Sequence, residues 1–337
     1  MIRAALVGMG NWGHNLVSHV QGKSEHIQFV AGATRTPEKA QAFAEEFGLK
    51  LFDSYEALLA SDEVDAVVLA TPHTLHSEQI IAAAKSGKHV FSEKPIGLDL
   101  ESAKAAAQAC QDHDVVLSVG YNWRFQPALQ EIHRLITSGA LGRVLHLEGN
   151  FCGPSAYRFP KGHWRHAKEE GPAGGMTGRG VHVMDAMIYL AGRVEQLTAQ
   201  SFRLAQDFGI DDTTSMLMRF ESGATGYLGT VIATAETWRL QVFCANGWVE
   251  VGDIEHLHTW GLKVCMIDRD NVTSKPRPVE YSYEPMSTEL AELEYFAKCI
   301  EQNKKLVLPD GDPIHNVAVL EAINASSVSN LPVRISQ

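Results

Sequence analysis

The feature that most constrains the fold is a glycine-rich turn close to the N-terminus. The residues Gly8-Met9-Gly10-Asn11-Trp12-Gly13 follow an apolar run at 2–7 and open an amphipathic stretch. A strand, a turn of this type and a helix, in that order, form a phosphate-binding site for a dinucleotide. The first glycine permits the tight turn, the second lets the backbone approach a pyrophosphate, and the third lets helix and strand pack closely. The predicted cofactor contacts here are Gly8, Gly10, Asn11, Trp12 and Gly13.

The pattern that continues over the first 120 residues supports this interpretation. Short β-branched apolar runs alternate with longer amphipathic stretches, which indicates βαβ units and a doubly wound parallel sheet, the Rossmann arrangement. The expected strands are 3–7, 28–33, 66–69, 89–91 and 115–119. We therefore predict a dinucleotide-binding domain over 1–121.

The rest of the chain has a different pattern. A helix at 127–138 and a strand at 144–150 precede a long loop rich in Gly, Pro and His. Several strand-like segments then follow one another without long helices between them, which predicts a large, mostly antiparallel sheet in an α+β domain. Helices are expected at 287–301 and 313–329. A chain of 337 residues suits two domains, so 122–337 is assigned to a substrate-binding and oligomerisation domain.

Composition limits the classes of partner. The formal net charge is -11, which disfavours nucleic acid and anionic membranes as partners of the whole surface. The five cysteines are scattered without any C-x-x-C spacing, so a reducing, cytoplasmic location is expected. No signal-type segment is seen, and no apolar run approaches the roughly 20 residues that span a bilayer. A sheet with an uncovered face favours a homodimer or homotetramer.

The end of the second expected strand bears on cofactor choice. An NAD enzyme usually carries Asp or Glu there, where it binds the ribose 2′-hydroxyl. This chain instead has Thr34 and Arg35, with Lys39 five residues after Thr34. A hydroxyl and two cations match a 2′-phosphate, so the sequence predicts NADP, with NAD as the alternative.

Motifs further along the chain carry a resemblance to a known family. They are Thr-Pro-His-Thr-Leu-His at 71–76, Gly-Lys-His-Val-Phe-Ser-Glu-Lys-Pro at 87–95, Gly-Tyr-Asn-Trp-Arg-Phe-Gln-Pro at 120–127, Trp-Arg at 164–165, Gly-Gly at 174–175 and Gly-Val-His-Val-Met-Asp at 180–185. In order and spacing they resemble the glucose–fructose oxidoreductase/inositol dehydrogenase (Gfo/Idh/MocA) family. The resemblance implies further cofactor contacts at Thr71, Pro72, His76, Glu93, Lys94 and Asn122, and a cis bond between Lys94 and Pro95.

The same resemblance implies the catalytic residues. Lys94 is expected beside the nicotinamide, where it binds the reacting oxygen, with Glu93 helping to orient it. A lysine transfers a proton at neutral pH only if its pKa falls from about 10.4, which a cationic ring and desolvation favour. His182 matches the family's general base. Its usual aspartate partner, four residues earlier, is replaced by Gly178.

The expected reaction moves a hydride between nicotinamide and a secondary alcohol or carbonyl of a sugar, sugar derivative or cyclitol. The substrate contacts are taken to be Lys94, Arg124, Trp164, Arg165, Arg179 and His182. The three arginines of this set, with Arg158 and Lys161, keep open an anionic substrate such as a sugar acid or carboxylated ring diol. A nucleotide-binding regulatory sensor of the same fold is the non-enzymatic alternative. His163 and His166 have no cysteine or carboxylate nearby in sequence, so no metal is predicted.

Overall fold

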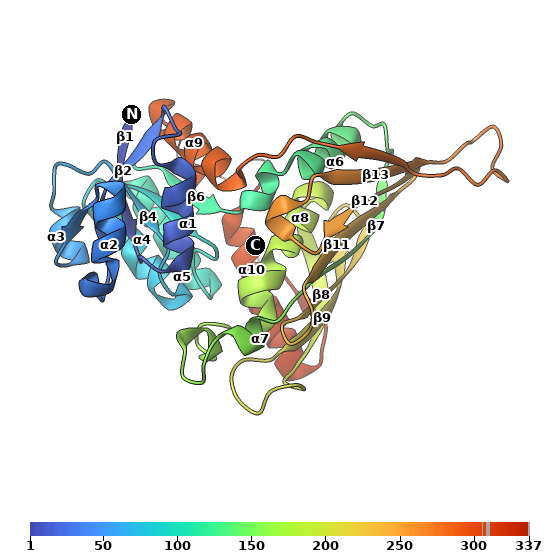
Figure 1. Cartoon of the computed structure of the whole chain (residues 1–337). Helices are drawn as coiled ribbons and strands as arrows, with labels where there is room; N and C mark the ends of the chain where they lie inside the picture. Colours follow the sequence, from blue (N-terminus) through green and yellow to red (C-terminus); the bar gives the residue numbers. More distant parts are fainter. Residues whose placement is uncertain (305, 308–310, 336–337) are drawn as a thin grey trace. The chain divides into compact units, whose positions relative to one another are not determined.

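The computed structural model describes residues 1–304, 306–307 and 311–335. The chain forms two compact units (Figure 1). The first comprises Met1–Asn122 and Ser287–Val317, and the second comprises Trp123–Met286 and the chain from Ala318 onward.

The sequence predicts one continuous domain over 122–337. In the structure, Ser287–Val317 belongs to the first unit. The physical reason is helix α9 (Thr288–Glu301). Its Leu293, Phe296 and Ala297 are buried in the hydrophobic core that strands and helices of the first unit form. Burial of such side chains contributes about 1.5–3 kcal/mol each for the larger ones, so the helix is held in this unit by its apolar face.

The first unit contains a seven-stranded sheet in the order β15-β6-β5-β4-β1-β2-β3. Every neighbouring pair is parallel, as the alternation of strands and helices predicts. The strands are β1 (Ile2–Val7), β2 (Ile27–Ala33), β3 (Lys50–Phe52), β4 (Ala66–Leu69), β5 (His89–Glu93), β6 (Leu117–Gly120) and β15 (Leu306–Val307). Because β1 lies between β4 and β2, its carboxyl end is the point at which the strand order reverses, where ligands of such sheets bind.

Helices cover the apolar strands of this sheet. Side chains of α1, α2 and α9 share one hydrophobic cluster with β1, β2, β4 and β5. Helices α4 and α5 pack against each other and bury their own alanine-rich faces. The helix bounds are α1 (Asn11–Val20), α2 (Pro37–Phe47), α3 (Tyr55–Leu59), α4 (His76–Lys85) and α5 (Leu100–Asp112).

The second unit contains a nine-stranded sheet in the order β14-β13-β12-β11-β7-β10-β9-β8-β16. All neighbours are antiparallel except β7 and β10, so the prediction of a mostly antiparallel sheet is confirmed. The strands are β7 (Val144–Cys152), β8 (Val194–Phe202), β9 (Thr213–Phe220), β10 (Thr225–Val231), β11 (Thr237–Cys244), β12 (Gly247–Asp253), β13 (Gly261–Met266), β14 (Val279–Ser282) and β16 (Val333–Arg334).

Helices of this unit lie on one side of the sheet (Figure 1). They are α6 (Pro127–Thr137), α7 (Ser155–Arg158), α8 (Val181–Ala191) and the part of α10 (Pro313–Ser329) that begins at Ala318. Helix α8 approaches β7 closely at Gly149, where an added Cβ would lie 2.6 Å from Val183 Cγ1. A glycine is therefore needed at 149 for α8, which carries His182, to pack at this distance. In the described part of the chain, no helix is both long and apolar enough to cross a bilayer.

Candidate functional site

The glycine turn predicted from the sequence has the geometry of a phosphate cradle. Gly8 adopts a φ of +91°, and a Cβ there would lie 2.6 Å from the Ala70 carbonyl oxygen. A Cβ on Gly13 would lie 2.5 Å from the Gly8 carbonyl oxygen, so this glycine sets the packing of α1 on β1. Gly10 has nothing within 4 Å of the Cβ position. The open space at Gly10 is what the approach of a pyrophosphate requires.

Helix α1 begins at Asn11, immediately after this cradle. Among the described residues, no side chain caps its N-terminus and no acidic residue lies in its first turn. The backbone N–H groups of that turn and the positive end of the helix dipole favour an anion at this place. The residues present therefore fit the diphosphate of a dinucleotide.

The end of β2 presents the residues that the sequence linked to cofactor choice. The strand ends at Ala33, and Thr34 follows as a half-buried residue. Arg35 is exposed after it, and Lys39 is exposed in the first turns of α2. No carboxylate occupies the segment from Ala33 to Pro37, so a hydroxyl and two cations remain as the polar groups of this strand end.

His76 connects the loops that follow β4 and β5. Its side chain is fully buried, with Nδ1 2.7 Å from the Pro95 carbonyl oxygen and Nε2 3.0 Å from the Thr71 carbonyl oxygen. Thr71 also donates a hydrogen bond from its hydroxyl to Gln79 Oε1 at 2.6 Å. His76 thus positions the backbone of the two loops, and Thr71 and Pro72 are half-buried just after the carboxyl end of β4.

Glu93 is the last residue of β5, and its carboxylate is buried. Trp12 donates a hydrogen bond from Nε1 to Glu93 Oε1 at 2.5 Å, which ties the glycine-rich turn to the end of β5. Burial raises the pKa of the Glu93 carboxyl, while the adjacent Lys94 and the Trp12 hydrogen bond act in the opposite direction. Lys94 itself is half-buried, and the Lys94–Pro95 bond is cis, as the resemblance predicts.

Asn122 stands at the end of the first unit and is also buried. It donates a hydrogen bond from Nδ2 to the hydroxyl of Thr288, the first residue of α9, at 3.1 Å. Helix α9 brings Glu289 and Glu292 into this region, and the sequence analysis did not identify either residue. A signal was present, because both glutamates fall on the face of the helix that continues with Leu293, Phe296 and Ala297.

In the second unit, His182 is the second residue of α8 and follows a π-helical turn, Met176–Gly180. Its ring stacks on Trp123, with centroids 5.2 Å apart and an interplanar angle of 23°. The ring of His256 lies 6.4 Å from that of His182, and Phe151 contacts both histidines. Aromatic packing therefore orients the imidazole where the family's aspartate is replaced by Gly178. Sequence reasoning missed Trp123, Phe151 and His256.

Asp185, one turn along α8, binds Arg124. The guanidinium donates two hydrogen bonds to the carboxylate, from Nε at 2.8 Å and from Nη2 at 2.7 Å. Both side chains are at most 1% exposed, and the guanidinium also lies 4.8 Å from the Tyr189 ring centroid. The charge of Arg124 is thus matched inside the protein, and the pair holds α8 to the segment that carries Trp123.

Two other predicted substrate residues lie in the loop between β7 and α8. Arg165 stacks over the Trp164 ring at 4.4 Å and over the Phe159 ring at 5.4 Å. Both Trp164 and Arg165 are half-buried. The loop therefore offers a cationic and aromatic surface, which suits contact with a polar ring compound.

Arg179, in the π-helical turn, is paired with an acid. It donates a hydrogen bond to Glu236 at 2.6 Å and one to the Cys152 carbonyl oxygen at 2.8 Å. Arg158 donates to the same carboxylate at 3.0 Å. These ion pairs remove much of the basis for an anionic substrate. No three His, Cys, Asp or Glu side chains of the described residues are grouped to hold a metal.

Comparison with known proteins gives matches over most of the chain. Residues 2–121 match the model of the Gfo/Idh/MocA oxidoreductase family with an NAD-binding Rossmann fold, and residues 129–250 match a C-terminal domain of the same family. Scyllo-inositol 2-dehydrogenase (NAD(+)) of Bacillus subtilis is 27% identical, over 99% of this chain and 96% of that protein. D-xylose 1-dehydrogenase (NADP(+)) 2 of Haloferax volcanii is 29% identical, over 90% and 89%. A solved structure from Desulfitobacterium hafniense has a TM-score of 0.90 at 25% identity, over 99% and 97%.

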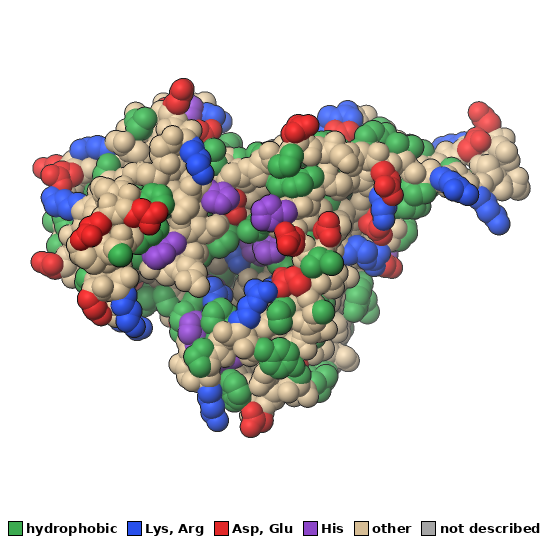
Figure 2. All heavy atoms as spheres, in the orientation of Figure 1, with side chains coloured by type: hydrophobic (Ala, Val, Ile, Leu, Met, Phe, Trp, Pro, Cys, Tyr) green, Lys and Arg blue, Asp and Glu red, His purple; other side chains and the backbone are tan. Residues whose placement is uncertain are grey.

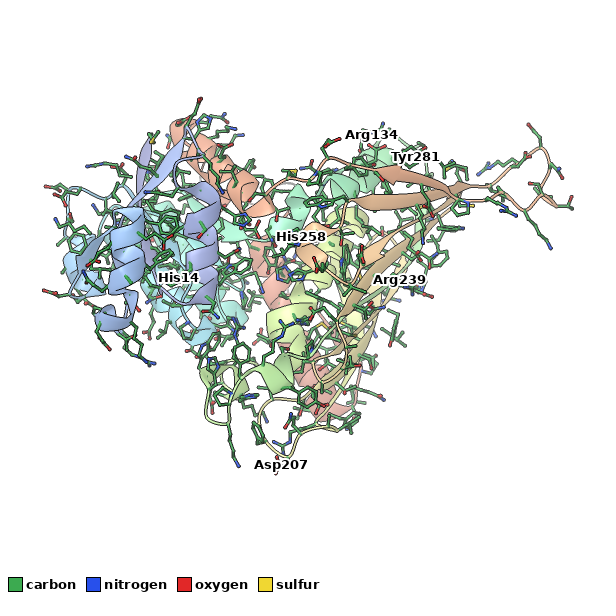
Figure 3. The ribbon with its side chains drawn as sticks, viewed as in Figure 1. His14, Arg134, Asp207, Arg239, His258 and Tyr281 are labelled. Atoms are coloured by element: carbon green, nitrogen blue, oxygen red, sulfur yellow. The ribbon has the colours of Figure 1, made fainter. Side chains whose placement is uncertain are left out.

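The buried Arg124–Asp185 pair yields a stability prediction. Asp185→Asn removes the buried carboxylate that accepts two hydrogen bonds from the Arg124 guanidinium, so the free energy of unfolding should fall by about 3–5 kcal/mol. Glu131→Gln is the matched control, because it breaks an exposed pair with Arg134 (Figure 3) and should cost about 0–1 kcal/mol. Urea unfolding of both variants measures the difference. Equal losses would show that the buried pair is not a structural anchor.

Proposed function

We propose that this chain, which belongs to the Gfo/Idh/MocA oxidoreductase family, transfers a hydride between a nicotinamide cofactor and a secondary alcohol or carbonyl of a sugar, sugar derivative or cyclitol. The observation that carries the proposal is the half-buried Lys94, which follows the buried carboxylate of Glu93. Both lie at the carboxyl end of the sheet whose first strand runs into the open glycine cradle. Relatives that act on scyllo-inositol and on D-xylose support this substrate class.

The residues of the first unit fit a dinucleotide. The cradle at Gly8, Gly10 and Gly13 and the first turn of α1 would hold the diphosphate, and Thr71, Pro72 and Asn122 would face the rest of the molecule. When bound, the nicotinamide supplies the carbon that accepts or donates the hydride. Lys94 binds the reacting oxygen and, as a neutral amine, removes its proton when an alcohol is oxidised. In the reverse direction its ammonium donates that proton.

His182 has the second polar role in the proposed reaction. Its ring is held by Trp123 and lies near His256, so it presents a fixed imidazole edge to a substrate. An imidazole donates or accepts a hydrogen bond at a sugar hydroxyl. Glu93 accepts the hydrogen bond from Trp12, and its carboxyl group acts electrostatically on the adjacent Lys94.

We also propose NADP as the preferred cofactor. Thr34, Arg35 and Lys39 supply a hydroxyl and two exposed cations at the end of β2, where a carboxylate would favour NAD. Curated relatives include enzymes named for either cofactor, so the family alone does not decide the choice. Support for NADP comes from the charge of this strand end.

The proposed setting is cytoplasmic, and the proposed assembly is a homodimer or homotetramer. All five cysteines are free, which suits a reducing compartment.

On the sheet face away from α8, exposed Leu217 and Tyr227 lie opposite each other on β9 and β10. Arg239 on the same face pairs with Glu148 and Glu250 (Figure 3), so a second subunit would meet apolar groups beside matched charges. Figure 2 shows cations and anions interspersed on the visible surface of each unit, which does not favour a polyanion as partner.

Replacing Lys94 tests the proposed chemistry. Lys94→Met keeps the chain length but removes the proton-transfer group, so turnover should fall about 10²–10⁴-fold while cofactor affinity stays nearly intact. Lys85→Met, an exposed lysine on α4, is the control and should keep wild-type rates. A screen of polyols, sugars and sugar acids with both cofactors, followed by nicotinamide absorbance, supplies the substrate. Near-normal turnover of Lys94→Met would contradict the assignment.

Replacing Arg35 tests cofactor choice. Wild-type kcat/KM should be higher with NADP, and Arg35→Ala should raise the KM for NADP about ten- to a hundredfold, the worth of a charge-assisted hydrogen bond. The KM for NAD should change little. Arg203→Ala, an exposed arginine of the second unit, should alter neither value. A wild-type preference for NAD, or equal loss with both cofactors, would overturn the proposal.

The oligomer is tested at the exposed apolar pair. Leu217→Asp places a charge on the proposed interface, so the mass from light scattering should fall from that of a dimer or tetramer to a smaller species. Leu204→Asp changes a leucine that is also exposed but lies in a loop, and it should leave the mass unchanged. A monomeric wild-type protein would rule out the assembly.

A further inference from the structure

The buried face of α9 changes character along its length. Its second half carries Leu293, Phe296 and Ala297, which lie in the hydrophobic core of the first unit. The first half of the same face carries three polar residues instead, and each is at most 2% exposed: Thr288, Glu289 and Glu292. Acidic side chains are almost never fully buried unless they are paired, so each one here calls for a partner.

Glu289 has such partners. It accepts hydrogen bonds from Thr288 Oγ1 at 3.2 Å and from Asn15 Nδ2 at 3.4 Å. His19 Nδ1 lies 3.4 Å from its Oε2, and Ser287 donates to the same oxygen at 3.3 Å. Several donors and a histidine stabilise the ionised form of a carboxyl group. Both carboxyl oxygens of Glu289 are therefore satisfied although the side chain is buried.

Glu292 is in a different state. Its side chain is 1% exposed, and within the described residues neither carboxyl oxygen has a hydrogen-bond partner. An ionised carboxylate in this environment would cost several kcal/mol. Burial raises the pKa of the Glu292 carboxyl well above its usual range, and the negative charges of Glu93 and Glu289 act in the same direction. The positive charge of Lys94 acts in the opposite direction.

We propose that Glu292 is a neutral carboxylic acid at neutral pH and is a positioning residue that sets how many negative charges act on Lys94. The charged groups that act on it are Glu93 and Lys94 at the end of β5 and Glu289 on its own helix, with His19 of α1 paired to Glu289. The role in catalysis rests on the proposed function of Lys94. The proposed protonation state of Glu292 is independent of that function.

The protonation state of Glu292 affects the protonation state of Lys94, the group proposed to accept the proton of the alcohol. A neutral Glu292 with a neutral Lys94 carries the same number of protons as a Glu292 carboxylate with a Lys94 ammonium. A neutral acid therefore favours the free amine, the form that accepts a proton from an alcohol. When Lys94 takes up that proton, its positive charge favours ionisation of Glu292.

Infrared spectroscopy tests the protonation state without any substrate. At pH 7 the wild type should show a carbonyl band of a protonated carboxyl group that is absent from Glu292→Gln, where an amide imitates the neutral acid. Glu301→Gln, an exposed glutamate at the end of the same helix, should keep the band. A wild-type spectrum identical to that of Glu292→Gln in this region would show that Glu292 is ionised and overturn the proposal.

Stability against pH provides a second readout. A carboxyl whose pKa is raised in the folded state binds more protons folded than unfolded, so its contribution to stability is lost as pH rises from about 4.3 through the folded value. Glu292→Gln has no such loss. Its Tm relative to wild type should rise steadily with pH over that range, whereas the Glu301→Gln difference should stay flat. A flat difference for Glu292→Gln would contradict the neutral acid.

Competitive labelling of amines, with Lys94 quantified by mass spectrometry, tests the link to the lysine. In the wild type, ionisation of Glu292 holds the ammonium to higher pH, so the labelling midpoint of Lys94 should fall by about one pH unit in Glu292→Gln. The midpoint in Glu301→Gln should equal that of wild type. An unchanged midpoint in Glu292→Gln would overturn the positioning role. A protein inactive on every substrate would instead sink the proposed function and leave this result standing.

Discussion

Burial of the Glu93 carboxylate is the constraint on which the chemistry of the first unit depends. The group accepts a hydrogen bond from Trp12, so the end of β5 and the glycine turn after β1 are held together. Gly120 of β6 leaves room for the Glu93 side chain, because a Cβ at position 120 would lie 3.0 Å from Glu93 Oε1. A buried carboxylate is stable only with compensating donors or cations, and here these are the indole and Lys94. The buried Glu93 therefore links the glycine turn after β1, the end of β5 and Lys94.

The second unit fixes its histidine by packing. The position four residues before His182 holds Gly178, so the aspartate–histidine pair of the family cannot form there. Trp123 stacks on the imidazole instead, and the Arg124–Asp185 pair holds the helix of His182 to the segment of Trp123. Gly149 allows that helix to lie close to β7. An apolar contact and a buried ion pair thus replace the orientation that a carboxylate would give.

The parts of this arrangement that follow a short-range pattern were predictable from the sequence. The glycine turn, the five strands that alternate with helices and the antiparallel second sheet all have local periodicities or spacings. Strands β3 and β15 were missed because three and two residues are too few for a period to register. The place of α9 in the first unit depends on contacts between residues more than 200 positions apart, such as Phe91 and Phe296. The stacking of His182 on Trp123 is likewise tertiary, and no spacing in the sequence encodes it.

The two units therefore position their functional side chains differently: the first by buried charged groups around Lys94, the second by aromatic packing around His182. On the proposed mechanism, the charge state of Lys94 depends on Glu93, to which Trp12 donates a hydrogen bond, and on the acids of α9, and all of these residues lie in the first unit. Lys94, the group that on this mechanism binds the reacting oxygen and exchanges its proton, is therefore positioned by the first unit. The second unit is then free to vary its substrate contacts without disturbing the proton balance. Relatives named for a cyclitol and for an aldopentose that match this chain across both units are what such a separation allows.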